Sequence, residues 1–338
     1  MAALLLGFGV GYGQGVREDG KAKLLVFGDV NLGRAVGQRL IRGNLGYPFE
    51  LVIDTLRKAD IVFVNLESQL SNQHGVTEHP KYNMIFTGPP TGAVTLKQAN
   101  ISVVSTANNH AFDYGIRALR ETIENLRDAG VRWVGTSTDS VGESKPAIIE
   151  CGNIKIGFLA YTQFVNSQGS WGGRIALFEK DRARRDIEAL KLSVDMVVVS
   201  YHAGAEYVDA PPAKLRQEFR YLVECGADVV LGHHPHYVQG IEWYRGKLVF
   251  YSLGNFVFHQ PQRNWTRYGL GVEIDLVKDT TVAGITNVAL RVVRSGLQPS
   301  FEVTELEESQ FFDRLKSLSS ARIQRLGGVW AIDQKGHQ

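Results

Sequence analysis

Short apolar runs alternate with helically spaced apolar residues along most of this chain. Unbroken apolar runs predict strands at 24–27, 61–64, 101–104, 196–199 and 229–231. Helical spacing predicts helices at 35–42, 49–58, 93–99, 116–129, 182–192 and 213–224. The helix at 116–129 places Leu119, Ile123 and Leu126 on one face, and Gly130 follows it as an expected C-cap. The alternation of strands with helices predicts an α/β fold.

Other strands are expected to pair in the antiparallel sense. Two hairpins are predicted, 148–150 with 154–160 through the turn CGN, and 241–243 with 248–251 through the turn YRG. The stretch 269–303 is also rich in strand-forming residues. These segments predict a second, mixed sheet packed on the first, within one domain that spans residues 21–305. Residues 306–338 are predicted to form a peripheral helical tail.

Residues 1–20 resemble a signal segment. Ala2–Val10 is a short apolar run followed by small residues, as in the core and cleavage site of a signal peptide. The first basic residue is Arg17, so the basic start of such a peptide is missing and the segment could be truncated. The run is too short to span a membrane, which takes roughly 18 or more apolar residues. We therefore expect a protein of the periplasm, the cell envelope or the extracellular space, with the cytoplasm as the alternative.

The charge balance excludes one class of partner. The 338 residues carry 37 Lys and Arg against 35 Asp and Glu, a net charge of +2. Nucleic-acid-binding proteins have a basic excess, so no nucleic-acid partner is expected. Cys151 and Cys225 are too few for a disulfide framework or a cysteine-rich zinc site. Neither GxSxG nor GxxxxGK[ST] occurs in the chain.

Polar residues suited to metal binding follow five of the predicted strands. They are Asp29, Asn65, Glu67, Asn109, His110, His202, His233, His234 and His236. In α/β sheets ligands bind beyond the carboxyl ends of the strands, so we expect these side chains to gather at one edge. Carboxylates, carboxamides and imidazoles together suit Mn, Fe or Zn. Because the residues outnumber the ligands of one tetrahedral site, one or two divalent ions are predicted, which could activate water.

Each of these residues also has an ordinary structural interpretation. Asp29 could cap a helix, and His202 could be a hydrogen-bonded core histidine. His234 and His236 are one residue apart, and on an extended segment both would face the same side. The metal interpretation depends on all these residues occurring together at strand ends.

Other residues of the chain could act as a general acid or bind an anionic substrate. His110 precedes Asp113, whose carboxylate could orient the imidazole as a general acid. Some arginines could meet an anionic substrate, although a plain surface charge is the favoured interpretation for each. They are Arg34, Arg174, Arg263 and Arg267.

These motifs together resemble a known family. The matching segments, in order, are GDVNLGR (28–34), NLES (65–68), ANNHAFDYG (107–115), VSYHAGAEY (199–207), GADVVLGHHPHYVQGIE (226–242) and YSLGNF (251–256). The chain is similar to the CapA-type proteins of bacterial capsule and poly-γ-glutamate synthesis, which are relatives of the calcineurin-like metallophosphoesterases. The resemblance spans about residues 23–277.

The resemblance implies a four-layer α/β/β/α sandwich of two packed mixed sheets, with the metal site at the sheet edges. The metal-binding residues that it implies are Asp29 and His236 for a first metal, Asn109, His202 and His234 for a second, and Glu67 or Asn65 for the bridge. It further implies that His110 is the catalytic acid, held by Asp113, and that Asn255 lies near the site.

The chain departs from the metallophosphoesterase pattern at three places. Asn31 stands where a histidine is usual, the segment with Asn65 and Glu67 replaces the bridging aspartate, and NNH replaces GNH. The first two departures weaken the first metal site, so a single tightly held ion or altered chemistry is an alternative. His233 and His234 are alternatives as the ligand. Residues expected to contact the substrate or support the ligands are Asn31, Arg34, Asn65, His233 and Asn255.

Two functions follow from these observations. The first is a metal-dependent hydrolase that attacks a phosphoester, or an amide bond of a capsule or cell-envelope polymer, with His110 as the acid. The second is a non-catalytic accessory factor in synthesis or export of the capsule polymer. Expected partners are an anionic small molecule or polymer and, for the second function, membrane proteins of capsule synthesis.

Overall fold

The computed structural model describes residues 20–82, 84–139, 145–167, 169 and 171–334. The expected signal segment at 1–20 therefore lies almost wholly outside the described residues. No helix in these ranges is long and apolar enough to cross a membrane.

A nine-stranded mixed sheet forms the larger half of the fold. Its strands follow the order β16-β17-β15-β14-β1-β2-β5-β6, and β13 pairs with β1 beside this path. The strands are β1 (Lys21–Val30), β2 (Ile61–Leu66), β5 (Val103–Ser105), β6 (Arg132–Val134), β13 (Asn255–Val257), β14 (Tyr268–Lys278), β15 (Ala283–Arg294), β16 (Ile323–Leu326) and β17 (Val329–Ile332). The strands from β1 through β6 in this order are parallel, whereas β14 and β15 are antiparallel to their neighbours.

A six-stranded sheet packs against the first. Its order is β11-β12-β10-β9-β8-β7, and β3 (Gln69–Leu70) with β4 (Thr87–Gly88) forms a separate pair. The strands are β7 (Ala147–Cys151), β8 (Ile154–Thr162), β9 (Met196–His202), β10 (Val229–His233), β11 (Ile241–Tyr244) and β12 (Lys247–Phe250). Both predicted hairpins are present as β7–β8 and β11–β12.

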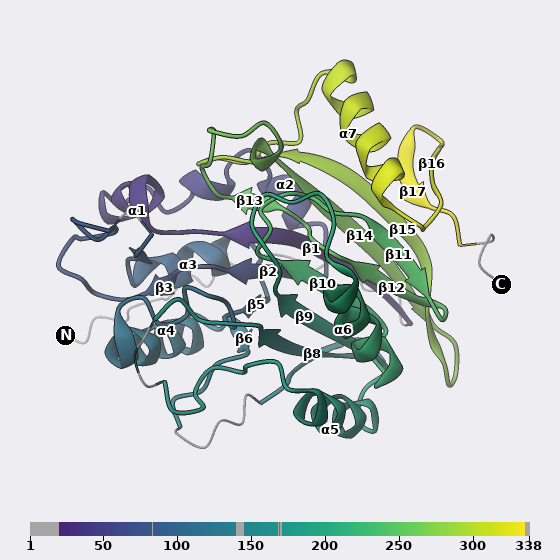
Figure 1. Ribbon diagram of the computed structural model, residues 1–338, viewed down its shortest axis with the longest axis horizontal. Helices are drawn as coiled ribbons and strands as arrows, with labels where there is room; N and C mark the ends of the chain where they lie inside the picture. The colour runs from purple at the N-terminus through teal and green to yellow at the C-terminus, as the bar shows by residue number, and fades with distance from the viewer. Residues whose placement is uncertain (1–19, 83, 140–144, 168, 170, 335–338) are drawn as a thin grey trace, which may run out of the picture.

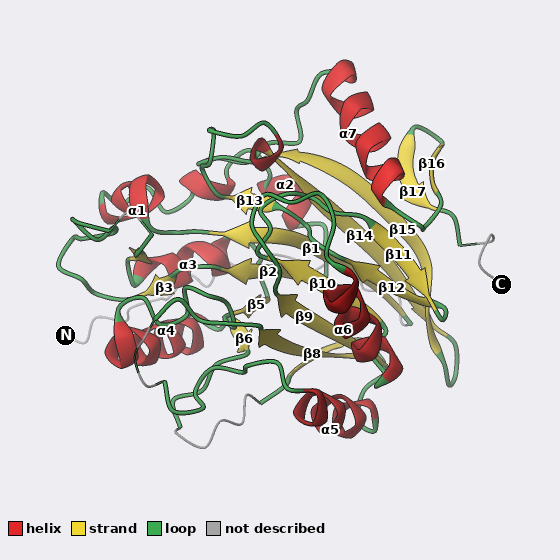
Figure 2. Ribbon diagram, in the orientation of Figure 1, coloured by secondary structure: helices red, strands yellow, loops and turns green. Residues whose placement is uncertain are grey.

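Helices cover the outer face of each sheet (Figure 2). Helices α1 (Arg34–Ile41), α2 (Ile53–Leu56), α3 (Thr91–Gln98) and α4 (Gly115–Ala129) lie on the first sheet, and α5 (Lys180–Lys191) with α6 (Ala213–Glu224) lies on the second. The remaining helices are η1 (Tyr47–Phe49), η2 (Trp265–Arg267) and α7 (Glu305–Leu318). The expected α/β sandwich with two packed mixed sheets is therefore confirmed.

Alternation along the strands builds the layers of the core. In β1, Leu24 faces the second sheet and Leu25 faces the helices. In β9, Val198 faces the first sheet and Val197 faces α5 and α6. Because successive side chains of a strand point to opposite faces, a strand buried on both sides is apolar throughout. This is why the unbroken apolar runs predict the central strands.

One predicted helix has a different form. Residues 49–58 do not form a single helix; η1 and the short α2 occupy this stretch, with Pro48 in the first turn of η1. Phe49, Val52 and Leu56 are nevertheless all buried. Two short turns therefore bury the same apolar residues that helical spacing had marked.

Residues 305–332 differ from the predicted peripheral helix. The inner face of α7 buries Phe311, Phe312 and Leu315 in the core between the two sheets. The hairpin β16–β17 then pairs with β15, and Trp330 stacks on Phe312 with 4.4 Å between ring centroids. This segment extends the first sheet and is part of the core, because its aromatic residues pack there.

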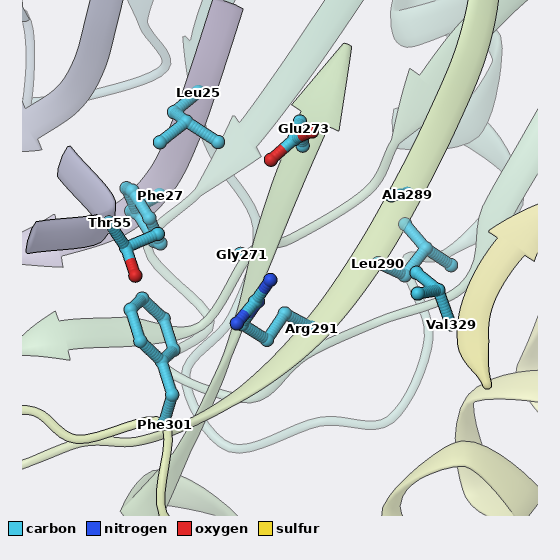
Figure 3. A pocket seen from close by; sticks show the side chains of 10 residues that line it. All are labelled: Leu25, Phe27, Thr55, Gly271, Glu273, Ala289, Leu290, Arg291, Phe301 and Val329. Atoms are coloured by element: carbon cyan, nitrogen blue, oxygen red, sulfur yellow. The ribbon is translucent and has the colours of Figure 1, made fainter. Parts of the chain in front are cut away.

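A small cavity lies on the outer face of the first sheet (Figure 3). Its walls include Leu25, Phe27, Thr55 and Arg291, and the Arg291 guanidinium lies 5.2 Å from the Phe301 ring centroid. Its volume of about 30 Å³ leaves room for roughly one water molecule. None of the predicted site residues lines it, so it is a packing gap and carries no argument for a substrate site.

Candidate metal centre

The ends of five parallel strands bring the predicted residues together. Asp29 in β1 is paired with Asn65 in β2, and His202 in β9 is paired with His233 in β10. The arrows of β1, β2, β9 and β10 point the same way in Figure 1, so their carboxyl ends meet at one side of the molecule. This is the arrangement that the strand-end pattern predicts.

Two glycines allow the strands to approach closely just before these residues. A Cβ atom at Gly28, which precedes Asp29, would lie 1.7 Å from the carbonyl oxygen of Gly254. A Cβ atom at Gly232, which precedes His233, would lie 2.0 Å from the carbonyl oxygen of Tyr251. Only glycine fits at such positions, so the GD and GH pairs of the sequence set the spacing of the strand ends.

Glu67 lies at the centre of the cluster. Its Oε1 atom lies 3.7 Å from Nε2 of His236, 3.9 Å from Nε2 of His202 and 4.0 Å from Nε2 of His110. The side chain is fully buried, and Oε1 has no hydrogen-bond partner among the described residues. A buried carboxylate oxygen without a partner is costly unless a cation binds it.

Two candidate ligand groups share Glu67. One consists of Glu67, His202 and His234, and the other of Asp29, Glu67 and His236, with ligand atoms within 4.8 Å of one another in each group. All these side chains are buried. The donor set could hold one or two divalent ions, and of Asn65 and Glu67, the two candidates that the resemblance leaves open for the bridge, only Glu67 belongs to these groups. Asn65 instead donates a hydrogen bond from Nδ2 to Asp29 Oδ1 over 2.9 Å.

Asp29 is surrounded by imidazole nitrogens. Its Oδ1 lies 3.3 Å from His233 Nδ1, and its Oδ2 lies 3.2 Å from His236 Nδ1. Burial alone would raise the pKa of Asp29, but His233 and His236 outweigh it and hold this pKa well below its ordinary value. Asp29 is thus a charged carboxylate inside the protein.

The pKa values of the other candidate ligands favour metal binding. Burial, followed by the charge of Asp29, raises the pKa of Glu67 well above its ordinary value. Burial and the neighbouring His234 lower the pKa of His202, and burial with His236 lowers that of His234 to about 3. Neutral imidazoles are the form that binds metals, and a cation would stabilise the Glu67 carboxylate.

The backbone around the two later histidines is strained. His234 has φ +98° and His236 has φ +55°, so the segment is not extended as the sequence analysis assumed. Left-handed backbone at residues other than glycine costs energy and concentrates at functional sites. The turn still brings both imidazoles to Glu67, in different candidate ligand groups.

His110 and Asp113 form the predicted pair at the side of the cluster. Nδ1 of His110 lies 2.8 Å from Oδ2 of Asp113, which also accepts a hydrogen bond from the Phe86 N–H. The Phe86 ring packs 4.2 Å from the His110 ring, and the Arg34 guanidinium lies 4.7 Å from the centroid of Phe86. Arg34 is therefore one aromatic ring away from His110 and is paired with Glu78 at 3.3 Å.

Carboxamides support the histidines. His202 Nε2 lies 2.8 Å from Asn109 Oδ1, and His236 Nδ1 lies 2.8 Å from Asn255 Oδ1. The second contact leaves Nε2 of His236 directed at Glu67. Asn31 has another role, because its Oδ1 accepts a hydrogen bond from the Gly33 N–H before α1. The contact of His236 with Asn255 is on the ring nitrogen that does not face Glu67, and such a contact fixes the orientation of a metal-binding imidazole.

Two supporting residues, Asn108 and Gln69, were not expected from the sequence. Asn108 donates hydrogen bonds to Asn65 Oδ1 and to the Leu66 carbonyl, and its own Oδ1 accepts from the His110 N–H. Gln69 donates to the Ala111 carbonyl and accepts from the Tyr114 N–H. Asn108 belongs to the NNH motif, so its place beside Asn109 could have identified it. Gln69 has no comparable signal in the sequence.

The chain matches a known family over most of its length. Residues 23–260 match the family described as bacterial capsule synthesis protein PGA_cap. The capsule biosynthesis protein CapA of Bacillus anthracis is 29% identical over 261 residues, and the PGA biosynthesis protein CapA of Bacillus subtilis is 31% identical over 245 residues. These matches cover 74% and 71% of this chain, but 62% and 63% of the relatives. The chain thus spans about three fifths of their length.

A solved structure with the same fold supports the assignment of the architecture. The calcineurin-like phosphoesterase YfkN of Bacillus subtilis superimposes with a TM-score of 0.52, covering 89% of this chain and 99% of that structure at 15% identity. At this identity the likeness concerns the fold alone. The family match and the two relatives establish that the chain belongs to the PGA_cap, or CapA, family of bacterial capsule synthesis proteins, with a fold like that of calcineurin-like phosphoesterases.

Proposed function

We propose that this protein is a hydrolase that depends on a divalent metal and acts on an anionic polymer of the capsule or cell envelope. The bond cleaved is a phosphoester or a polymer amide. The observation that carries the proposal is the unpartnered Oε1 of Glu67, shared by two candidate ligand groups and 4.0 Å from the His110 Nε2 atom. A purely structural cluster would pair this oxygen.

The ligand set suits Mn, Fe or Zn. Asp29, Glu67 and His236 would hold one ion, and Glu67, His202 and His234, with Asn109 beside them, would hold a second. When bound, a divalent ion acts as a Lewis acid and lowers the pKa of water, which supplies a nucleophile near neutral pH.

His110 supplies the proton in the proposed reaction. The Asp113 carboxylate accepts from Nδ1 of His110 and so directs Nε2 into the cluster. From there Nε2 can donate a proton to the leaving group.

Aromatic rings keep water away from the candidate ligands. Phe86 packs on His110, Phe258 packs 4.8 Å from His236, and Phe164 packs 4.9 Å from His234. A site partly closed to water strengthens electrostatic contacts with the reacting group.

The direct test is turnover by wild type and by His110→Gln and Asp113→Asn. Substrates are p-nitrophenyl phosphomonoester and phosphodiester and a poly-γ-glutamate oligomer. Removing the acid is expected to lower kcat about 10²–10⁴-fold, with the metal content unchanged. Asp113→Asn should lower kcat less and shift the pH profile, because His110 keeps its place but loses its charged partner. Equal turnover in all three proteins would contradict the role of His110.

A second function is favoured by the names of the relatives, which refer to biosynthesis and not to hydrolysis. In that case the chain would be an accessory factor of capsule polymer synthesis or export, acting with membrane proteins of the same process. Polymer production by cells that carry Asp29→Ala separates the two. An accessory factor tolerates the loss of a metal ligand, whereas a hydrolase required for production does not.

Under either function we propose that the protein acts outside the cytoplasm, as the apolar start of the chain suggests.

A further inference from the structure

We propose that Arg263, held against Tyr207, forms a subsite for a carboxylate of an acidic polymer beside the metal centre. The inference rests on the proposed function, because it names a group that recognises the polymer substrate. Arg263 lies beyond residues 23–260, which match the family, so the match assigns it no role.

Arg263 places a positive charge on the Tyr207 ring, which in turn lies beside His236. Its guanidinium lies 4.5 Å from the centroid of the Tyr207 ring, and that ring lies 6.1 Å from the ring of His236. The Arg263 side chain is exposed, and no carboxylate of the described ranges lies within 4.0 Å of its guanidinium. A planar guanidinium stacked on an aromatic ring keeps its edge free to bind a carboxylate through two hydrogen bonds.

The loop that carries Arg263 is fixed to the candidate ligands. Thr266 Oγ1 donates to the Arg263 carbonyl over 2.8 Å, and the Thr266 carbonyl accepts from Asn255 Nδ2 over 3.0 Å. Asn255 Oδ1 is in turn 2.8 Å from His236 Nδ1. Thr266 and Asn255 are each 1% exposed, so the hydrogen bonds from Thr266 to His236 are buried, and the one to Arg263 is partly buried. Arg263 is therefore held at a defined place relative to His236.

Tyr207 is fixed from the opposite side. Its backbone N–H donates to the Pro235 carbonyl over 2.8 Å, and its φ of +63° is left-handed. Its hydroxyl accepts a hydrogen bond from Gln260 Nε2 over 3.3 Å. A strained tyrosine tied to the segment between His234 and His236 is a rigid platform for the arginine.

The arrangement favours an extended polyanion over a small phosphoester. Arg263 and His236 each lie against the Tyr207 ring, at 4.5 Å and 6.1 Å from its centroid, so the guanidinium is beside the candidate metal ligands without being one of them. A polymer with a carboxylate on each unit can place one unit at the metal centre and the carboxylate of a neighbouring unit on Arg263. On the other flank Arg34 is already paired with Glu78, which makes Arg263 the better candidate for this contact.

Binding of a poly-γ-glutamate oligomer of about ten units, measured by calorimetry, tests the subsite. All variants carry His110→Gln, so that the probe is not consumed, and thermal unfolding verifies that each is folded. Arg263→Gln is expected to weaken binding about tenfold, the loss of one charge-assisted contact. Arg263→Lys should recover part of this, because the charge remains without the planar group. Arg267→Gln, on the same loop, is the matched control and should bind within about twofold of the parent protein.

A second probe distinguishes charge from shape. The α-methyl ester of the same oligomer lacks the carboxylates and should bind weakly and equally to all the proteins. The subsite is contradicted if Arg263→Gln binds the oligomer like the parent, if Arg267→Gln loses as much, or if the parent does not distinguish the oligomer from its ester. Because binding is the readout, loss of the hydrolase function leaves an Arg263 effect standing. Conversely, turnover by the wild-type protein with no Arg263 effect would reject the subsite alone.

Discussion

His233 illustrates how a residue beside the ligands can control them. It is fully buried at the end of β10, and its Nδ1 lies 3.3 Å from Asp29 Oδ1. It does not belong to either candidate ligand group, whereas His234 belongs to one of them. We therefore propose that His233 positions Asp29 and that His234 would contact the metal.

This assignment predicts the behaviour of His233 variants. His233→Ala should weaken metal binding about 10–100-fold, because the Asp29 carboxylate loses one of the two imidazoles beside it. His233→Gln should recover part of the affinity, since its amide can donate to Asp29. Competition with a fluorescent chelator measures both affinities. If the two variants bind metal equally, His233 only fills space.

The sequence predicted which side chains gather at the candidate metal centre, because most of these residues directly follow a predicted strand. Asp29, Glu67, His202 and His236 come together for the reason expected, the shared edge of parallel strands. The choice between His233 and His234 could not be made in advance. It depends on the left-handed turn at His234 and His236, and no periodicity in the sequence encodes that turn.

At the level of elements, α7 belongs to the core. Sequence pattern shows that a helix has a buried face, but not which surface covers that face. Phe312 is fully buried between the sheets and stacked on Trp330, a contact that depends on how the β16–β17 hairpin after α7 folds back onto the helix. This is why a helix of modest amphipathicity could be taken for a peripheral tail.

Because α7 packs in the core, we expect the loss of its Phe312 ring to lower the stability of the protein strongly. Phe312→Ala should lower the free energy of unfolding by about 3–5 kcal/mol, through lost burial and the cavity left behind. Leu306→Ala, on the same helix at a position 66% exposed, is the matched control and should change it by no more than about 0.5 kcal/mol. Urea denaturation measures both. Similar values for the two variants would mean that α7 is only loosely attached.

At the scale of the whole molecule, the buried histidines make stability depend on pH. The pKa of His234 is about 3 in the folded protein, because burial and His236 disfavour its charged form, against an ordinary value of 6.5. As pH falls below 6.5 the unfolded chain takes up a proton that the folded protein does not, so the free energy of unfolding decreases. Glu67 acts with the opposite sign, since its raised pKa destabilises the metal-free protein as pH rises above 4.5.

His234→Asn isolates the histidine contribution. In metal-free protein, its free energy of unfolding minus that of wild type should increase as pH is lowered from about 7 to 4. Urea titrations across this range give the difference, in which the other titrating groups largely cancel. A difference that does not vary with pH would show that His234 has an ordinary pKa in the folded protein.

Equilibrium metal content most directly tests the central claim, that Glu67 joins two ligand groups into one divalent metal centre. Wild type and Glu67→Gln would be dialysed against Mn, Fe(II) or Zn and examined by elemental analysis. The account predicts one or two ions per wild-type chain and a large loss in Glu67→Gln, which keeps the shape of Glu67 without its charge. Wild-type protein that binds none of these metals, or a Glu67→Gln variant that binds as much as wild type, would contradict it.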